Sequence, residues 1–156
     1  MEKTPSSFYT IRFNDCDPFG HLNNSKYIDY CLNAREDHLK EAYGIDLREW
    51  ASQGIGFVVS QHEIRYLRPA NYNDIVCIQT ALIGAGDSWL LVEMSMYDQE
   101  RQQLKAIIWS KFTSIDIRTG RKENLPAIVK PFVQGALLEG VEVEKGLQAR
   151  VDLVRN

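Results

Sequence analysis

Residues 15–24 carry the side chains of this sequence whose types and spacing best suit catalysis. They read Asp-Cys-Asp-Pro-Phe-Gly-His-Leu-Asn-Asn, and an amphipathic helix pattern follows directly. The first backbone N–H groups of a helix have no partner within the helix, and that end carries about half a positive charge. Such an end can hold a developing oxyanion, while a neighbouring carboxylate attacks or activates water. We therefore expect an active site where this loop meets the helix.

The helix that must position this loop is predicted from Ser25 to Gly44. Apolar residues recur along one side of this segment at helical spacing, and polar residues fill the other side. Asn23 or Asn24 can cap the first turn, and Gly44 can end the helix in the left-handed conformation.

The rest of the chain reads mainly as strands. A short strand is expected at 8–13, and after residue 55 the apolar pattern changes to a period of two. Four strands are predicted there, separated by short turns: 57–67, 74–83, 89–97 and 104–117. This order predicts an α+β domain in which an antiparallel sheet wraps around one long central helix.

We expect a single domain over residues 1–156, with its core at about 8–130 and a tail at 131–156. The last fifteen or so residues are rich in charge, so we expect them to fray.

The composition excludes several classes of protein. Of the 156 residues, 44% are hydrophobic and 25% are charged, and the formal net charge is −3. An acidic balance argues against a nucleic-acid partner. Three cysteines without a CxxC pair favour a reducing compartment, and neither a signal peptide nor a membrane-spanning run is found. We expect a cytoplasmic protein.

No metal and no cofactor are predicted. Asp15, Asp17 and Gly20 are spaced like the start of an EF-hand loop, but the twelfth position holds Lys26, where a bidentate glutamate is required. The Gly-x-Gly sequence at 54–56 lacks the spacing of a dinucleotide-binding loop, and no His/Cys cluster has zinc spacing.

The segment 15–20, followed by Asn24, Tyr27 and a long helix, resembles the signature of hotdog-fold thioesterases, in particular the 4-hydroxybenzoyl-CoA thioesterase family. The sequence Tyr-Leu-Arg-Pro-Ala at 66–70, with Asp74, resembles a second motif of the bacterial acyl-CoA thioester hydrolases in that family. The resemblance covers roughly residues 8 to 130. It implies a hotdog fold, an acyl-CoA substrate and assembly into a homodimer or homotetramer.

The same resemblance implies catalytic roles for particular residues. The second aspartate of the motif, Asp17, would be the catalytic carboxylate, and a helix N-terminal amide near Asn24 would polarise the thioester carbonyl. The segment 20–24 is also similar to a motif of plant acyl-ACP thioesterases, in which an aspartate, an asparagine and a histidine act together. Asp17 and His21 match two of these, whereas the third position holds Phe19.

Structural interpretations of these residues stand beside the catalytic ones. Asp-Pro-x-Gly is also a good type I turn, His21 can orient the substrate or hold Asp17, and Asn23 can be a cap. The sequence does not decide whether Asp17 is a nucleophile or a general base. Non-catalytic binding of acyl thioesters and hydrolysis of acyl-ACP remain alternatives.

Substrate contacts are predicted for two aromatic residues, an amide and a base: Phe19, Tyr27, Asn23 and Arg68. Phosphate contacts to the carrier are predicted among the basic residues Arg65, Arg68, Lys111, Arg118, Arg121 and Lys122.

Overall fold

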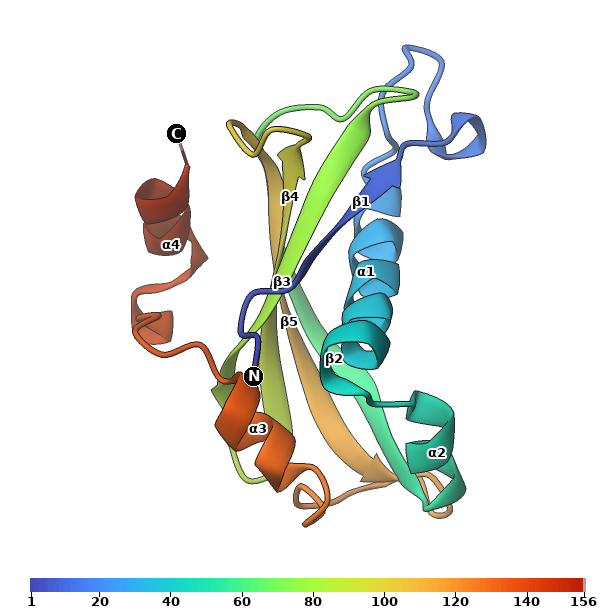
Figure 1. The fold of residues 1–156 in the computed structure, drawn as a ribbon, viewed down its shortest axis with the longest axis vertical. Helices are drawn as coiled ribbons and strands as arrows, with labels where there is room; N and C mark the ends of the chain where they lie inside the picture. The colour runs from blue at the N-terminus through green and yellow to red at the C-terminus, as the bar shows by residue number, and fades with distance from the viewer. Residues whose placement is uncertain (156) are drawn as a thin grey trace.

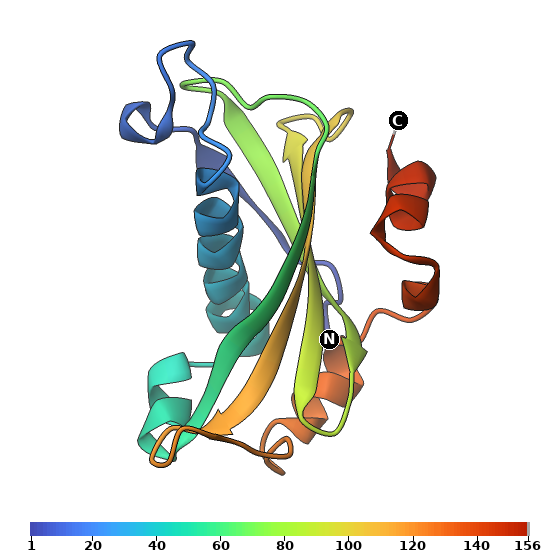
Figure 2. The same ribbon diagram turned by 180° about the vertical axis from the view of Figure 1, so that it is seen from behind.

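A curled antiparallel sheet wraps around one long helix, α1 (Lys26–Tyr43), in the computed structural model, which describes residues 1–155 (Figures 1 and 2). The sheet strands are β1 (Ser6–Thr10), β2 (Ile55–Tyr66), β3 (Ile75–Ala85), β4 (Trp89–Asp98), β5 (Leu104–Asp116) and the short β6 (Arg121–Lys122). Their order is β1-β3-β4-β5-β2, with β6 paired to β5. The predicted α+β arrangement and its four long strands are confirmed.

The smaller helical elements lie around this core. They are the 3-10 turn η1 (Phe13–Asp15), α2 (Leu47–Ser52), α3 (Lys130–Ala136), the 3-10 turn η2 (Val143–Lys145) and α4 (Leu147–Val154). In the described residues, 1–155, no helix has both the length and the apolar content needed to cross a membrane.

The inner face of the sheet forms the main core with α1. The buried residues of that helix recur every three or four positions, including Tyr27, Cys31 and Ala34. They pack against alternate residues of the central strands, among them Met94 and Ile108, which are fully buried. Gly44 ends the helix at φ 65°, in the left-handed conformation that the sequence predicts.

The outer face of the sheet is covered by the chain's C-terminal end, and here the predicted fraying is wrong. Leu147 and Val151 of α4 are buried against a second apolar cluster on that face. Arg150 of α4 donates two hydrogen bonds, of 2.9 and 3.0 Å, to the carboxylate of Glu93, which is only 4% exposed. Trp109 donates a third, of 2.9 Å. Part of the charge in this tail therefore lies in a buried ion pair, which holds α4 on the sheet.

The predicted strand at 8–13 is displaced. β1 starts earlier and ends at Thr10, because Ile11 instead exchanges backbone hydrogen bonds with the loop before β3. Phe13 then begins the turn η1, which redirects the chain towards the start of α1.

β2 lies at one edge of the sheet. The middle of this strand is exposed, and it includes two aliphatic side chains, Val58 and Val59, that are 45% and 41% exposed. An open edge with apolar side chains is a surface suited to pairing with another strand.

Candidate active site

The loop before α1 is a tight turn closed by its own backbone. The Gly20 N–H donates to the Asp17 carbonyl (3.0 Å), and the Asp17 N–H donates to the His21 carbonyl (2.8 Å). Gly20 has a φ of +79°, which favours glycine at the last position of this turn. The turn predicted from Asp-Pro-x-Gly is thus present.

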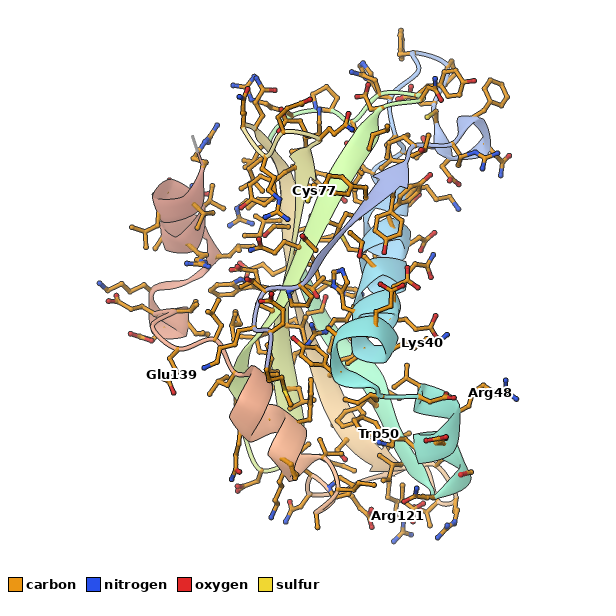
Figure 3. All side chains as sticks on the ribbon, viewed as in Figure 1. Lys40, Arg48, Trp50, Cys77, Arg121 and Glu139 are labelled. Atoms are coloured by element: carbon orange, nitrogen blue, oxygen red, sulfur yellow. The ribbon has the colours of Figure 1, made fainter. Side chains whose placement is uncertain are left out.

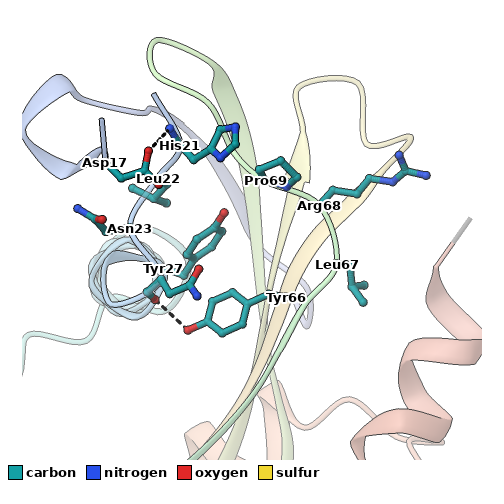
Figure 4. A pocket seen from close by; sticks show the side chains of 10 residues that line it. Asp17, His21, Leu22, Asn23, Tyr27, Tyr66, Leu67, Arg68 and Pro69 are labelled. Carbon is teal, nitrogen blue, oxygen red and sulfur yellow. Dashed lines mark hydrogen bonds between the residues drawn. The ribbon is translucent and has the colours of Figure 1, made fainter. Parts of the chain in front are cut away.

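The loop is also fastened to the segment that follows β2. The Leu22 N–H donates to the Ala70 carbonyl (2.8 Å), and the Tyr72 N–H donates to the Gly20 carbonyl (2.7 Å). Two segments about fifty residues apart in sequence therefore form one wall over the start of α1, as Figure 4 shows.

The Asp17 carboxylate is held by one oxygen and free at the other. Its Oδ1 accepts the backbone N–H groups of Phe19 (2.9 Å) and His21 (3.0 Å). Within the described residues, Oδ2 accepts no hydrogen bond. The carboxylate is therefore oriented by its own loop and keeps one oxygen for chemistry.

Asp15, the other carboxylate of the loop, is engaged instead. Its Oδ2 accepts the Tyr30 hydroxyl at 2.7 Å, and its backbone carbonyl accepts the Asn23 N–H at 2.9 Å. Burial and the Asp15 carboxylate raise the pKa of Tyr30 to about 12, which keeps this hydroxyl a donor. Asp15 thus fixes the loop to α1, and Asp17 is the carboxylate of the loop that is available for chemistry.

The start of α1 offers free backbone donors beside this loop. The Lys26 N–H donates to the Asn23 carbonyl (2.8 Å), whereas the N–H groups of Asn24 and Ser25 bond to no other group in the described part of the chain. No side chain of residues 1–155 caps the start of this helix, so the predicted cap by Asn23 or Asn24 is wrong. The uncapped start leaves amide donors available to a ligand.

Two tyrosines form the floor beside these donors. The Tyr66 hydroxyl donates to the Asn24 carbonyl (2.9 Å), and its ring meets that of Tyr27 edge to face, with centroids 5.2 Å apart (Figure 4). The Tyr27 hydroxyl in turn accepts the Ala70 N–H (3.0 Å). Burial raises the pKa of Tyr27. These contacts join α1 to the end of β2.

These groups line one cavity of about 490 Å³. Its walls are formed by Asp17, His21, Leu22, Asn23, Asn24, Tyr27, Tyr66, Leu67, Arg68 and Pro69. Six of the seven predicted site residues are therefore brought together. The exception is Phe19, whose side chain is 85% exposed and lies outside this lining, so its contact with substrate stays a prediction.

Two of the lining side chains do not reach the carboxylate. In Figure 4 the His21 imidazole turns towards Pro69, and the Arg68 guanidinium extends away from Asp17. His21 supports Asp17 through its backbone N–H rather than through its ring. Arg68 is the one residue of the predicted phosphate-binding set that lines this cavity among residues 1–155.

The lining residues that are not among the predicted site residues are Leu22, Tyr66, Leu67 and Pro69. The segment 66–70 was singled out only by resemblance, because nothing in its local pattern shows that it returns to the start of α1. The contact depends on the pairing of β2 with β5, whose residues are forty or more positions away in sequence.

Residues 11–137 match the sequence model described as the thioesterase-like superfamily. The long-chain acyl-CoA thioesterase FadM of Escherichia coli (strain K12) is 30% identical over 111 residues, covering 70% of this chain and 81% of that protein. The chloroplastic acyl-acyl carrier protein thioesterase ATL3 of Arabidopsis thaliana is 25% identical over 93 residues, covering 60% of this chain and 48% of the plant protein.

Among solved structures, a 1,4-dihydroxy-2-naphthoyl-CoA thioesterase from Synechocystis has a TM-score of 0.75. The match covers 87% of this chain and 96% of that chain at 20% sequence identity. At this identity the likeness concerns the fold alone, and it confirms the predicted hotdog arrangement.

Proposed function

Because the chain belongs to the thioesterase-like superfamily and is a thioester hydrolase, we propose that it hydrolyses acyl-CoA thioesters to the free acid and CoA. The observation that carries this proposal is that one cavity is lined both by Asp17, whose Oδ1 alone is engaged by the loop, and by Asn24, whose backbone N–H is unpaired in the described residues. The 30% identity to a long-chain acyl-CoA thioesterase supports CoA as the carrier.

In the proposed reaction the Asp17 carboxylate acts in one of two ways. Either Oδ2 attacks, expelling the CoA thiolate and forming a mixed anhydride that water then cleaves, or Oδ2 takes a proton from the water that attacks. The thiolate leaves without obligatory protonation, since the pKa of a thiol is near 8.5. The carboxylate is the nucleophile in the first route and the general base in the second.

The amides of Asn24 and Ser25 would hold the negative charge that develops on the carbonyl oxygen. Both N–H groups are unpaired and belong to the positive end of α1. The Tyr66 hydroxyl, through its bond to the Asn24 carbonyl, would keep this peptide oriented.

The remaining lining residues have supporting roles in this proposal. The backbone N–H of His21 holds the Asp17 carboxylate. Tyr27 and Asn23 contact the thioester region of the substrate, and Arg68 binds a phosphate of the carrier. Placement within the 4-hydroxybenzoyl-CoA thioesterase branch is part of the same prediction.

We also propose that the protein forms a homodimer, or a dimer of dimers, through the open edge of β2. The exposed Val58 and Val59 would be covered by pairing of this strand with its copy. Light scattering at micromolar concentration tests this, and a stable, active monomer contradicts it.

The activity is tested with a panel of purified acyl-CoAs, from short to long aliphatic chains and including aromatic acyl groups, with release of the thiol measured by a chromogenic reagent. Turnover of at least one acyl-CoA is expected. The same acyl group presented on acyl carrier protein addresses the second candidate, favoured by the similarity to the plant enzyme. Tight binding of acyl-CoA without any turnover would instead identify a binding module.

A further inference from the structure

A second cavity, of about 300 Å³, lies against the other half of α1, away from Asp17. Its walls are apolar and include Leu39 of α1, Trp50 of α2, Phe57 of β2 and Phe132 of α3. Figure 1 shows α2 and α3 at this end of the sheet, and Figure 3 shows Trp50 on the side of α2 that faces it. The volume is at the lower end of the range of about 300–1,000 Å³ found for small-molecule sites.

One charged side chain, Arg35, lines this otherwise apolar cavity. Arg35 is only 5% exposed, and its NH1 group donates to the Thr80 hydroxyl at 2.9 Å. None of the ion pairs in residues 1–155 includes it. Burial lowers the pKa of Arg35, which reflects the cost of holding a cation there. A buried charge without a counter-ion is expensive, so this guanidinium requires an explanation.

The neighbours of Arg35 do not supply the missing negative charge. His38 Nδ1 lies 2.7 Å from the same Thr80 hydroxyl, and burial lowers the pKa of His38 to about 4, so it is neutral at pH 7. The Arg35 guanidinium carbon lies 5.6 Å from the centroid of the Tyr43 ring. The buried Tyr43 hydroxyl has no hydrogen-bond partner in the described residues. The Arg35 guanidinium therefore has neutral partners in Thr80 and Tyr43 but no counter-ion in residues 1–155, and it lines an otherwise apolar space.

We propose that this second cavity binds a carboxylate with an unbranched apolar chain, such as a medium-chain fatty acid. The carboxylate pairs with the Arg35 guanidinium, whose planar fork matches two carboxylate oxygens, and the chain lies against Trp50 and Phe57. The two cavities share no lining residue, so this site is separate from that of Asp17. Binding here does not depend on turnover and is measured without it.

The first test compares decanoate with decan-1-ol by isothermal titration calorimetry. Both have the same apolar chain, so their ratio of affinities isolates the charge. Wild type should bind decanoate at least about 10-fold more tightly, in the range expected for hydrogen bonds to a charged group. Arg35→Met should remove this preference. Its thermal unfolding midpoint should not fall, because the variant removes an unpaired buried cation.

Two matched controls separate this site from other arginines. Arg48→Met changes an exposed arginine of α2, which points away from the sheet (Figure 3), and should leave the preference unchanged. Arg68→Met changes the arginine of the Asp17 cavity and should also leave it unchanged. Equal affinity for the two ligands in wild type, or a preference that persists in Arg35→Met, overturns the proposal.

A second measurement does not depend on the folding of an Arg35 variant. 10-Bromodecanoate should quench the fluorescence of Trp50, which lines the cavity, and Trp50→Phe should abolish most of this quenching. Trp89 and Trp109 line a different depression, on the outer side of the sheet. Quenching of undiminished size in Trp50→Phe places the ligand elsewhere and refutes the assignment.

Discussion

Replacing Asp17 by asparagine should abolish most of the hydrolysis while keeping the loop in place. The two N–H groups of Phe19 and His21 are donated to Oδ1, and an asparagine can offer its amide oxygen at that position. The free oxygen Oδ2 then becomes an NH₂ group, which neither attacks nor accepts a proton. Loss of a general base costs about 100- to 10,000-fold in rate. This equals about 2.7–5.4 kcal/mol of activation free energy at about 1.36 kcal/mol per tenfold.

The effect of Asp17→Asn on stability should be much smaller. A hydrogen bond to a charged group contributes about 1.5–3 kcal/mol and one between neutral groups about 0.5–1.5 kcal/mol. The difference, summed over two bonds, is at most about 2–3 kcal/mol, and solvent screening of the partly exposed Asp17 reduces it. Asp17→Ala loses both bonds outright, so it should melt at a lower temperature than Asp17→Asn.

Single-turnover hydrolysis of the best acyl-CoA, followed by thiol release, measures the chemical step for wild type and both variants. Thermal melts report folding, and the dissociation constant of a non-hydrolysable thioether analogue reports ground-state binding, which should change little. A folded Asp17→Asn protein with near-wild-type turnover would remove Asp17 from the mechanism.

Three further perturbations test other parts of the structure. Tyr66→Phe removes the hydrogen bond to the Asn24 carbonyl and should lower kcat/KM by about 2- to 10-fold, measured at unchanged thermal midpoint. Arg150→Met leaves the buried Glu93 carboxylate with a single donor and should destabilise the fold by about 3–5 kcal/mol in urea unfolding, whereas Arg155→Met, an exposed control, should not. For His38, burial lowers the pKa from 6.5 to about 4, so the unfolded chain takes up the proton first and stability falls by about 3 kcal/mol as the pH drops from 6.5 to 4. Urea unfolding of wild type and His38→Asn at both pH values isolates this share, and identical pH dependence would contradict it.

The long elements and the loop were predictable from the sequence because their signals are local. The helix is marked by apolar residues at helical spacing and by Gly44, and the strands by alternation, so both were predicted close to their observed bounds. The turn at Asp17 follows from the Asp-Pro-x-Gly sequence itself. These features do not depend on which segment packs against which.

The parts that were missed depend on distant contacts. The charged end of the chain was predicted to fray because the partner of Arg150 cannot be seen locally. That partner is Glu93, which lies fifty-seven positions away in sequence, on the outer face of the sheet. Arg35 lies within the predicted helix, but nothing in the local sequence indicates that the sheet buries its charged side chain. The predicted cap of α1 was wrong because the Asn23 backbone carbonyl, and not an asparagine side chain, accepts a hydrogen bond at the helix start, from the Lys26 N–H.

The two oxygens of Asp17 share one negative charge. The reaction at Oδ2 therefore changes the strength of the hydrogen bonds that Oδ1 accepts from the loop. Whether Oδ2 bonds to the acyl carbon or takes a proton, the charge leaves the carboxylate and Oδ1 becomes a neutral carbonyl oxygen. The N–H groups of Phe19 and His21 then face a weaker acceptor. The loop is therefore held most firmly before the chemical step and after its completion, and least firmly in between. Each turnover would be accompanied by one loosening and one tightening of the segment that carries the reacting group.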